Sequence, residues 1–265
     1  MIKKTIVTGM VALMSLAAMA LPAKRGLTNV ITLNDGTKVE VSLVGDEFMH
    51  YWQDANGNKY VPTGEANVFK LADASAVSNL TTRALARKAK AHARRAARRN
   101  LSNATDVFQG KKKGLVILVE FTDVKFKNSD SQTLFNRIAN EAGYNEGYFQ
   151  GSVKDYFLAQ SRGQFELDFD VVGPVKLSHN MKYYGGNDEN GYDLHPEEMI
   201  VEACKGIDSK VDFSKYDWDG DGEVDQVYVI YAGYGEADTG NENTIWPHKY
   251  QLSGASMALT LDGVK

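Results

Sequence analysis

The pattern of hydrophobic and polar positions divides the chain into four stretches of different character. An uncharged, mostly apolar stretch at the N-terminus is followed, over residues 27–72, by short runs of alternating polarity. Alanine and basic residues then dominate, and from residue 114 onwards long apolar runs are interspersed with helical spacings. We therefore predict four segments, with boundaries at 1–20, 21–73, 74–113 and 114–265.

The last segment has the pattern of a globular domain. The continuous apolar run 114–121 predicts a strand buried on both faces, and residues 224–232 predict a second deeply buried strand. Alternation of apolar residues within 164–172 predicts a further strand. Apolar residues at helical spacing predict helices at 131–142, 152–161 and 195–205. Helices and strands mix without a regular β-α-β alternation, so we predict an α+β fold, or a mixed sheet with helices packed on it.

Residues 27–72 are predicted to form a small β-rich unit. The sequence Asn34-Asp35-Gly36 between the apolar runs 30–33 and 38–43 is a strong hairpin signal. Three more short strands are predicted, at 48–53, 59–61 and 68–71. A unit of this size is too small to be a catalytic body, so we interpret it as a pro-segment or an accessory module.

The N-terminal stretch has the layout of an export signal. Lys3 and Lys4 provide a basic start, and the apolar run ends in Ala18-Met19-Ala20, the small-x-small pattern that a signal peptidase recognises. The run is shorter than the about 20 apolar residues of a membrane span, which argues against a retained anchor. We predict cleavage between Ala20 and Leu21, and a secreted or periplasmic product without a membrane segment.

Charge is distributed unevenly along the chain. Residues 1–113 carry 18 Lys and Arg against 8 Asp and Glu, whereas residues 114–265 carry 12 against 26. Between residues 74 and 105 there is no acidic residue. Alanine and arginine favour a helix there, but this stretch has almost no apolar face that a core would bury.

Three interpretations of the basic stretch remain open. It is a solvated linker, a linker that a trypsin-like protease cuts during activation, or a nucleic-acid-binding segment. The acidic main domain and the lack of a groove-reading motif argue against nucleic acid. The candidate processing positions are Arg94, Arg95, Arg98 and Arg99.

The sharpest local motif is the acidic loop Asp217-Trp218-Asp219-Gly220-Asp221-Gly222-Glu223-Val224-Asp225. Calcium needs six to eight oxygen ligands, and alternate side chains of a tightly curled loop point inward. We predict a calcium site with these ligands: Asp217, Asp219 and Asp221 through carboxylates, Glu223 through its carbonyl, and Asp225 directly or through water. Tyr228 stands where an EF-hand has its bidentate glutamate, so we expect a structural clip rather than a sensor. The alternative is a solvated acidic turn.

Residues for catalysis are less evident. Cys204 is the single cysteine, and it lies on an apolar helical stripe with Met199, Ala203 and Ile207, which favours core packing over a nucleophilic role. None of the five histidines has the H-E-x-x-H spacing. The residues alone therefore form no complete catalytic constellation.

Six stretches, taken together, resemble the secreted metallopeptidases of the immune inhibitor A type, and they occur in the order found in that family. They are GLVILVEFTDVKF (114–126), GSVKDYFLAQSRGQFELDFDVVGPV (151–175), YYGGND (183–188), HPEEMIVEAC (195–204), YDWDGDGEVDQVYVIYAGYGE (216–236) and IWPHK (245–249). The predicted signal peptide, small β unit and basic linker match the layout that precedes the catalytic domain in this family.

The resemblance implies a zincin-like fold and a zinc endopeptidase precursor. In such enzymes an H-E-x-x-H helix holds zinc, which activates water for attack on the peptide bond. In the family this helix follows shortly after the stretch that matches 245–249, so we expect the present sequence to stop before it and to lack activity alone. His248 is a conceivable zinc ligand, but beside Trp246 and Pro247 we interpret it as a structural residue.

Two functions follow as hypotheses. The first is a secreted zinc endopeptidase acting on proteins or peptides, held inactive by its own pro-segment. The second is a non-catalytic secreted binding module stabilised by calcium.

Overall fold

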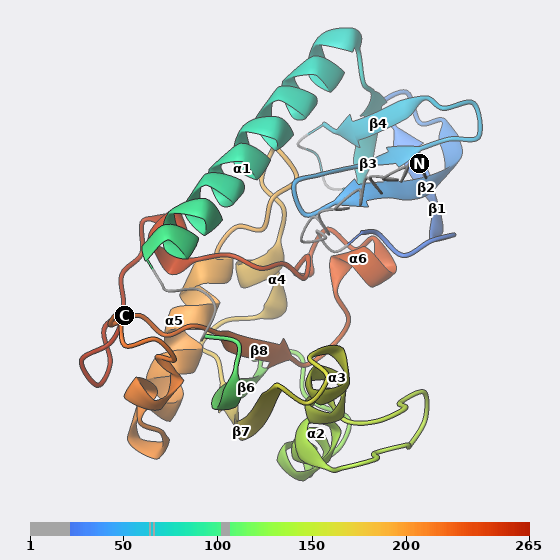
Figure 1. Cartoon of the computed structure of the whole chain (residues 1–265). Coiled ribbons are helices and arrows are strands. Elements are labelled where there is room, and N and C mark those ends of the chain that lie inside the picture. Colours follow the sequence, from blue (N-terminus) through green and yellow to red (C-terminus); the bar gives the residue numbers. More distant parts are fainter. Residues whose placement is uncertain (1–21, 64, 66, 102–106) are drawn as a thin grey trace, which may run out of the picture.

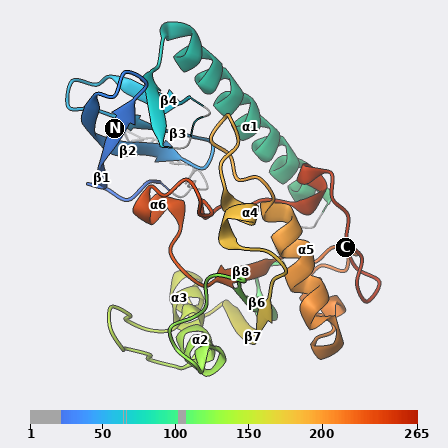
Figure 2. The same cartoon turned by 180° about the vertical axis from the view of Figure 1, so that it is seen from behind.

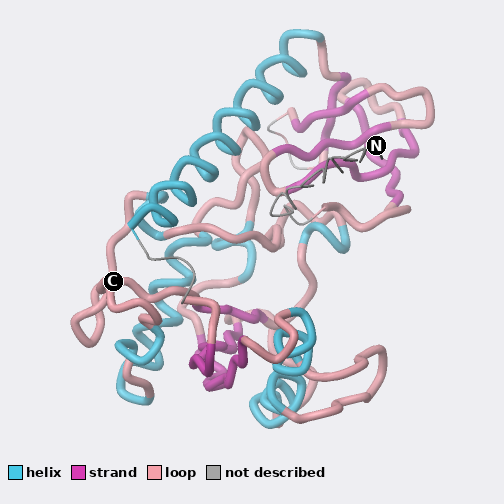
Figure 3. The backbone as a smooth tube through the Cα atoms, in the orientation of Figure 1, coloured by secondary structure: helices cyan, strands magenta, loops and turns pink. Residues whose placement is uncertain are grey.

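The computed structural model describes residues 22–63, 65, 67–101 and 107–265 (Figure 1). The predicted signal peptide and its cleavage point at Ala20 and Leu21 lie outside these residues. Helices and strands form an α+β structure in which a small barrel and a three-stranded sheet occupy separate places (Figure 3). None of the helices in the described ranges combines the length and apolarity that crossing a bilayer requires.

The small β-rich unit is a closed five-stranded barrel. The hairpin predicted at Asn34-Asp35-Gly36 is confirmed, since the strands on either side pair antiparallel and Gly36 has φ +84°. Parallel pairing between the first and last strands closes the barrel around Trp52, Tyr60 and Phe69. The five strands are β1 (Thr28–Leu33), β2 (Lys38–Asp46), β3 (Met49–Gln53), β4 (Lys59–Pro62) and β5 (Val68–Leu71).

The basic stretch forms one long helix, α1 (Ala74–Leu101). Figures 1 and 2 show it running beside the barrel and down toward the rest of the molecule. It has little apolar surface, yet it is docked: Lys88 Nζ lies 2.8 Å from Asp46 Oδ2 of the barrel, and the Arg87 guanidinium stacks 3.6 Å from the ring centroid of Tyr192. Polar and cation–π contacts therefore attach a helix that cannot bury itself in a core.

The main body, residues 107–265, is organised around a parallel sheet with the strand order β7-β6-β8. Residues 115–119 of the central strand are at most 6% exposed, which confirms the predicted strand covered on both faces. No antiparallel strand joins this sheet within the described residues, so the zincin-like mixed sheet stays a proposal. The strands are β6 (Gly110–Glu120), β7 (Phe165–Lys176) and β8 (Val227–Tyr231).

Two strands differ from the sequence prediction. The central strand starts at Gly110 rather than Gly114 because its lysines find partners on β7: Lys113 Nζ lies 2.9 Å from both Asp168 and Asp170. The strand predicted at 224–232 to be deeply buried is shorter, and all its residues are only half-buried. The burial prediction was wrong because the side chains of β8 line a large open cavity instead of lying fully under covering elements.

Helices cover both faces of the sheet. Apolar residues of α2 (Ser131–Asn140) and α3 (Val153–Gln160) pack on the face that carries Val116 and Leu118. The opposite face, with Leu115 and Ile117, packs on α4 (Met181–Gly185) and α5 (Pro196–Ile207). Cys204 lies in this second core and is 4% exposed, which confirms its predicted packing role. Short helical turns occupy α6 (Glu236–Thr239), Asp208–Lys210, Phe213–Tyr216 and Leu252–Ala255.

Candidate functional site

The acidic loop lies between the helical turn Phe213–Tyr216 and β8. It curls tightly because Gly220 and Gly222 take positive φ values of 75° and 83°. The Asp217 carboxylate accepts backbone N–H groups from Gly220, Asp221 and Gly222, at 2.8 to 3.2 Å. The loop backbone is thus wrapped around one carboxylate.

Three of the predicted ligands come together in this loop. One carboxylate oxygen each from Asp217, Asp219 and Asp225 lies within 4.8 Å of the others, and all three residues are half-buried. Asp221 and Glu223 are exposed, and their side chains are not part of this cluster. A set of carboxylate oxygens on a glycine-containing loop fits a hard cation such as calcium better than zinc, which prefers nitrogen and sulfur.

The loop is fastened to the central strand. The Trp218 indole N–H donates to the Lys113 carbonyl at 2.7 Å, and Lys112 Nζ donates to the Trp218 carbonyl at 2.9 Å. On the other side of the loop, the Val224 N–H donates to the Lys265 carbonyl at 2.8 Å, and the Lys265 N–H donates to the Gly222 carbonyl at 2.9 Å. A cation in the loop would therefore stabilise the attachment of β8 and the chain end to β6.

A second cluster of polar residues lies where the barrel meets the main body. His50 of β3 stacks on Trp246 with ring centroids 4.2 Å apart and planes 15° apart, and its Nε2 lies 3.4 Å from Glu236 Oε1. The Tyr192 hydroxyl donates to the Phe48 carbonyl at 3.2 Å. The Lys24 N–H donates to the Ala237 carbonyl at 2.7 Å, at the start of the barrel segment.

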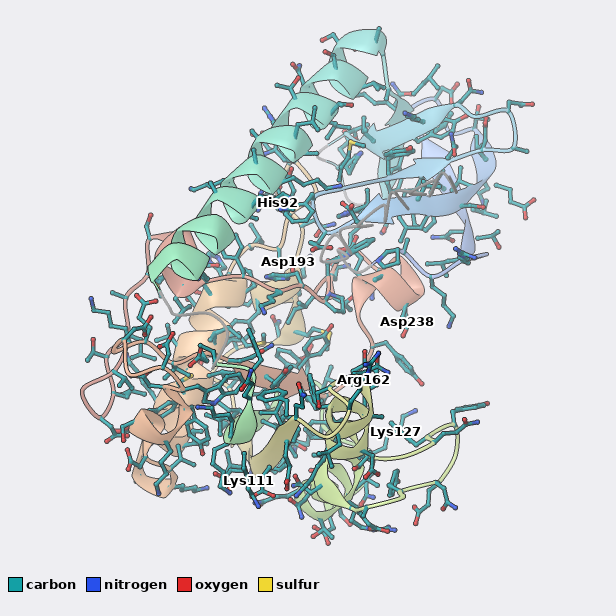
Figure 4. All side chains as sticks on the ribbon, viewed as in Figure 1. His92, Lys111, Lys127, Arg162, Asp193 and Asp238 are labelled. Carbon is teal, nitrogen blue, oxygen red and sulfur yellow. The ribbon has the colours of Figure 1, made fainter. Side chains whose placement is uncertain are left out.

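Buried acids surround this junction. Burial raises the pKa of Asp193 to about 8, although the Trp246 N–H donates to both its oxygens at 3.2 Å. Burial and the charge of Glu236 raise the pKa of Glu242 to about 7. Asp193 and α6 lie on the barrel-facing side of the main body (Figure 4). The sequence did not point to this cluster, because its members lie up to about 200 positions apart and share no motif.

The remaining predicted positions are distributed as follows. His248 Nδ1 donates to the Trp246 carbonyl at 2.7 Å, and burial lowers the pKa of His248. No group of three His, Cys, Asp or Glu ligand atoms gathers around it in the described ranges. The backbone of the four candidate processing arginines lies in the second half of α1, and they are Arg94, Arg95, Arg98 and Arg99.

Comparison with known proteins supports one family. The sequence model described as "Immune inhibitor A peptidase M6, catalytic domain" matches residues 100–264, more than half of the chain. Immune inhibitor A of Bacillus thuringiensis subsp. alesti is 26% identical over 184 residues, which cover 56% of this chain. The matched stretch spans 27% of that relative's length. Because the family match includes the sheet, the acidic loop and the segment with Trp246, the chain belongs to the immune inhibitor A peptidase M6 family.

Proposed function

We propose that this chain provides the pro-segment and part of the catalytic domain of a secreted zinc endopeptidase that hydrolyses proteins or peptides. The observation that supports this most is the catalytic-domain match over residues 100–264. Zinc in such an enzyme would polarise the peptide carbonyl and activate water. The described residues contain no zinc-type ligand set, so we assign them no step of the hydrolysis.

The test is a protease assay on the product of the complete coding sequence. We expect hydrolysis of a denatured protein substrate to cease with 1,10-phenanthroline and to return when zinc is added back. The non-chelating isomer 1,7-phenanthroline serves as the control, since it has the same ring system but leaves zinc in place. Hydrolysis that survives zinc removal, or a coding sequence without an H-E-x-x-H helix, would contradict the proposal.

We further propose that the barrel and α1 form the latency unit of this precursor. The predicted pro-segment (21–73) contains all five barrel strands, and the predicted linker region (74–113) contains α1. Both contact the main body near Trp246 and Tyr192, in and beside the family-matching segments. The proposed order of maturation is signal removal after residue 20, followed by cleavage near the arginine pairs of α1.

A calcium-stabilised binding module is the second candidate function. The acidic loop is compatible with it, because a structural cation site serves a binding protein as well as an enzyme. It predicts a specific ligand and no hydrolysis by the product of the complete coding sequence. The protease assay above therefore separates the two functions.

Calcium is the cation that we propose for the loop, held by Asp217, Asp219 and Asp225, with Asp221 and the Glu223 carbonyl as further ligands predicted from the sequence. Extracellular calcium sites have Kd values of about 0.1–1 mM, so 10 mM calcium should stabilise the protein by about 1.4–2.7 kcal/mol. We expect the Tm to rise by about 5 °C, and Asp219→Asn to abolish most of the rise. Differential scanning calorimetry with and without calcium measures both.

The control variant is Glu189→Gln, which removes an exposed carboxylate outside the loop. Its calcium response should equal that of the wild type. If calcium shifts the Tm of the wild type and of Asp219→Asn equally, the loop is not the site.

A further inference from the structure

His50 fills a pocket that belongs to the main body. Its side chain is only 10% exposed, although it comes from the barrel. Trp246 lies flat against one face of the imidazole, and Gly191 lies beside its edge, where a Cβ atom would come within 3.6 Å of Nε2. Glu236 faces the same nitrogen from α6. The barrel itself adds one contact, between Nδ1 and the Asp46 carbonyl at 3.4 Å.

The carboxylate of this pocket is unusually well buried. Glu236 is 1% exposed, and only its Oε1 has a hydrogen bond, from Asn187 Nδ2 at 3.0 Å. Oε2 is buried and finds no donor in the described part of the chain. A buried carboxylate oxygen without a donor is costly, so the site favours a ligand that brings a positive charge or additional N–H groups.

A stacked indole and a buried carboxylate recognise a particular kind of group. A planar cation gains from both: its face lies on the electron-rich indole, and its N–H groups reach the carboxylate in the same plane. Imidazolium and guanidinium have this shape, whereas the ammonium of lysine is a compact point charge.

We propose that Trp246, Glu236, Asn187 and Gly191 form a binding pocket for a planar cationic side chain, which His50 occupies within the same chain. When the barrel leaves, the pocket accepts the side chain of a histidine or an arginine from a peptide. The pocket itself does not depend on peptidase activity. That its later ligand is a substrate peptide rests on the proposed function.

The first test is chemical rescue in the full chain. His50→Ala should lower the Tm by a few degrees and leave a space for a small ligand. Imidazole or methylguanidine at about pH 6 should restore a large part of that loss, whereas phenol, which is planar but neutral, should not. The wild type, with its pocket filled, should not respond.

Two further variants keep the test decisive. Rescue should disappear in the double variant His50→Ala/Glu236→Gln, because the carboxylate is gone. His179→Ala provides a control for loss of an exposed imidazole, since His179 also stacks on a ring, with its centroid 3.9 Å from that of Tyr183. We expect no rescue of that variant by either cation.

A direct substitution covers the case in which His50→Ala does not fold. His50→Arg should keep a Tm close to that of the wild type, because its guanidinium replaces the imidazole, whereas His50→Leu should lose several degrees. Equal Tm values for the arginine and leucine variants would overturn the proposal. Rescue by phenol as strong as by imidazole, or no rescue of a folded His50→Ala, would overturn it as well. Each of these measurements is independent of hydrolysis.

Discussion

The free energy of unfolding of the wild type should fall as pH rises from about 4 to about 8, and replacing Asp193 with asparagine should remove most of this fall. The carboxyl has a pKa of about 8 in the folded protein, mainly because it is buried, with a side chain that is 5% exposed. In the unfolded chain its pKa is about 3.9. Folding therefore favours the protonated acid, and the native structure is penalised once solvent pH removes that proton.

The sign follows from proton linkage. A carboxyl whose pKa is raised by folding contributes its full stability below its unfolded value, and the contribution is lost as pH rises through the folded value. The window is thus about pH 4 to 8. A shift of this size corresponds to an upper limit of about 6 kcal/mol, so we expect a loss on the order of 3–5 kcal/mol in the wild type.

The groups that face Asp193 explain the direction. Glu236 and Glu197 oppose its ionisation, and burial opposes it more strongly. The Trp246 N–H and the charge of Arg87 act in the other direction but do not outweigh burial. His248 Nδ1 lies 3.7 Å from Oδ2, and burial lowers the pKa of this imidazole, which disfavours its charged form beside the carboxylate.

Urea unfolding at about pH 4.5, 6 and 8 measures the effect. Asparagine keeps the shape and one oxygen for the Trp246 N–H but has no proton to lose. Asp238→Asn is the control, because Asp238 is an exposed carboxylate of α6 on the same side of the molecule (Figure 4). Wild-type, Asp193→Asn and Asp238→Asn profiles that run parallel would show that Asp193 does not carry the pH dependence.

Local patterns in the sequence determined much of the fold. Asn34-Asp35-Gly36 is sufficient to indicate a hairpin, since few other tripeptides form so tight a turn. The run from Leu115 to Val119 indicates a covered strand, because five consecutive apolar residues have no polar face to expose. The stripe that contains Cys204 indicated a buried helix face by the same reasoning.

What the sequence did not reveal depends on contacts between distant segments. The half-buried state of β8 follows from the large cavity beside it, which its composition does not encode. The docking of α1 rests on Arg87 with Tyr192, a pair more than 100 positions apart. His50 has no distinctive local context, and its importance becomes visible only when Trp246 and Glu236 lie against it. In the acidic loop, spacing predicted the ligands but not which three carboxylates gather.

Helical structure in α1 should protect the candidate processing sites, and a proline should remove that protection. Proteases bind their substrates in extended form, so a bond within a helix is cut only after local unfolding. Ala93→Pro removes one helical hydrogen bond and clashes with the carbonyl four residues earlier, at a cost of about 3 kcal/mol. We expect cleavage after Arg94 and Arg95 to accelerate by about 100-fold, if opening is fast relative to cutting.

The effect should be confined to the end of α1. Arg83 contacts Asn190, and Lys88 pairs with Asp46, so the first half of the helix stays attached when the second half opens. Ala93→Ser is the control, because serine lowers helix propensity by less than about 0.7 kcal/mol. Limited trypsin digestion, with the new chain ends quantified by mass spectrometry, compares the three proteins. If the three proteins are cut after Arg94 and Arg95 at equal rates, opening of the helix does not limit processing. Control of maturation would then lie elsewhere in the chain.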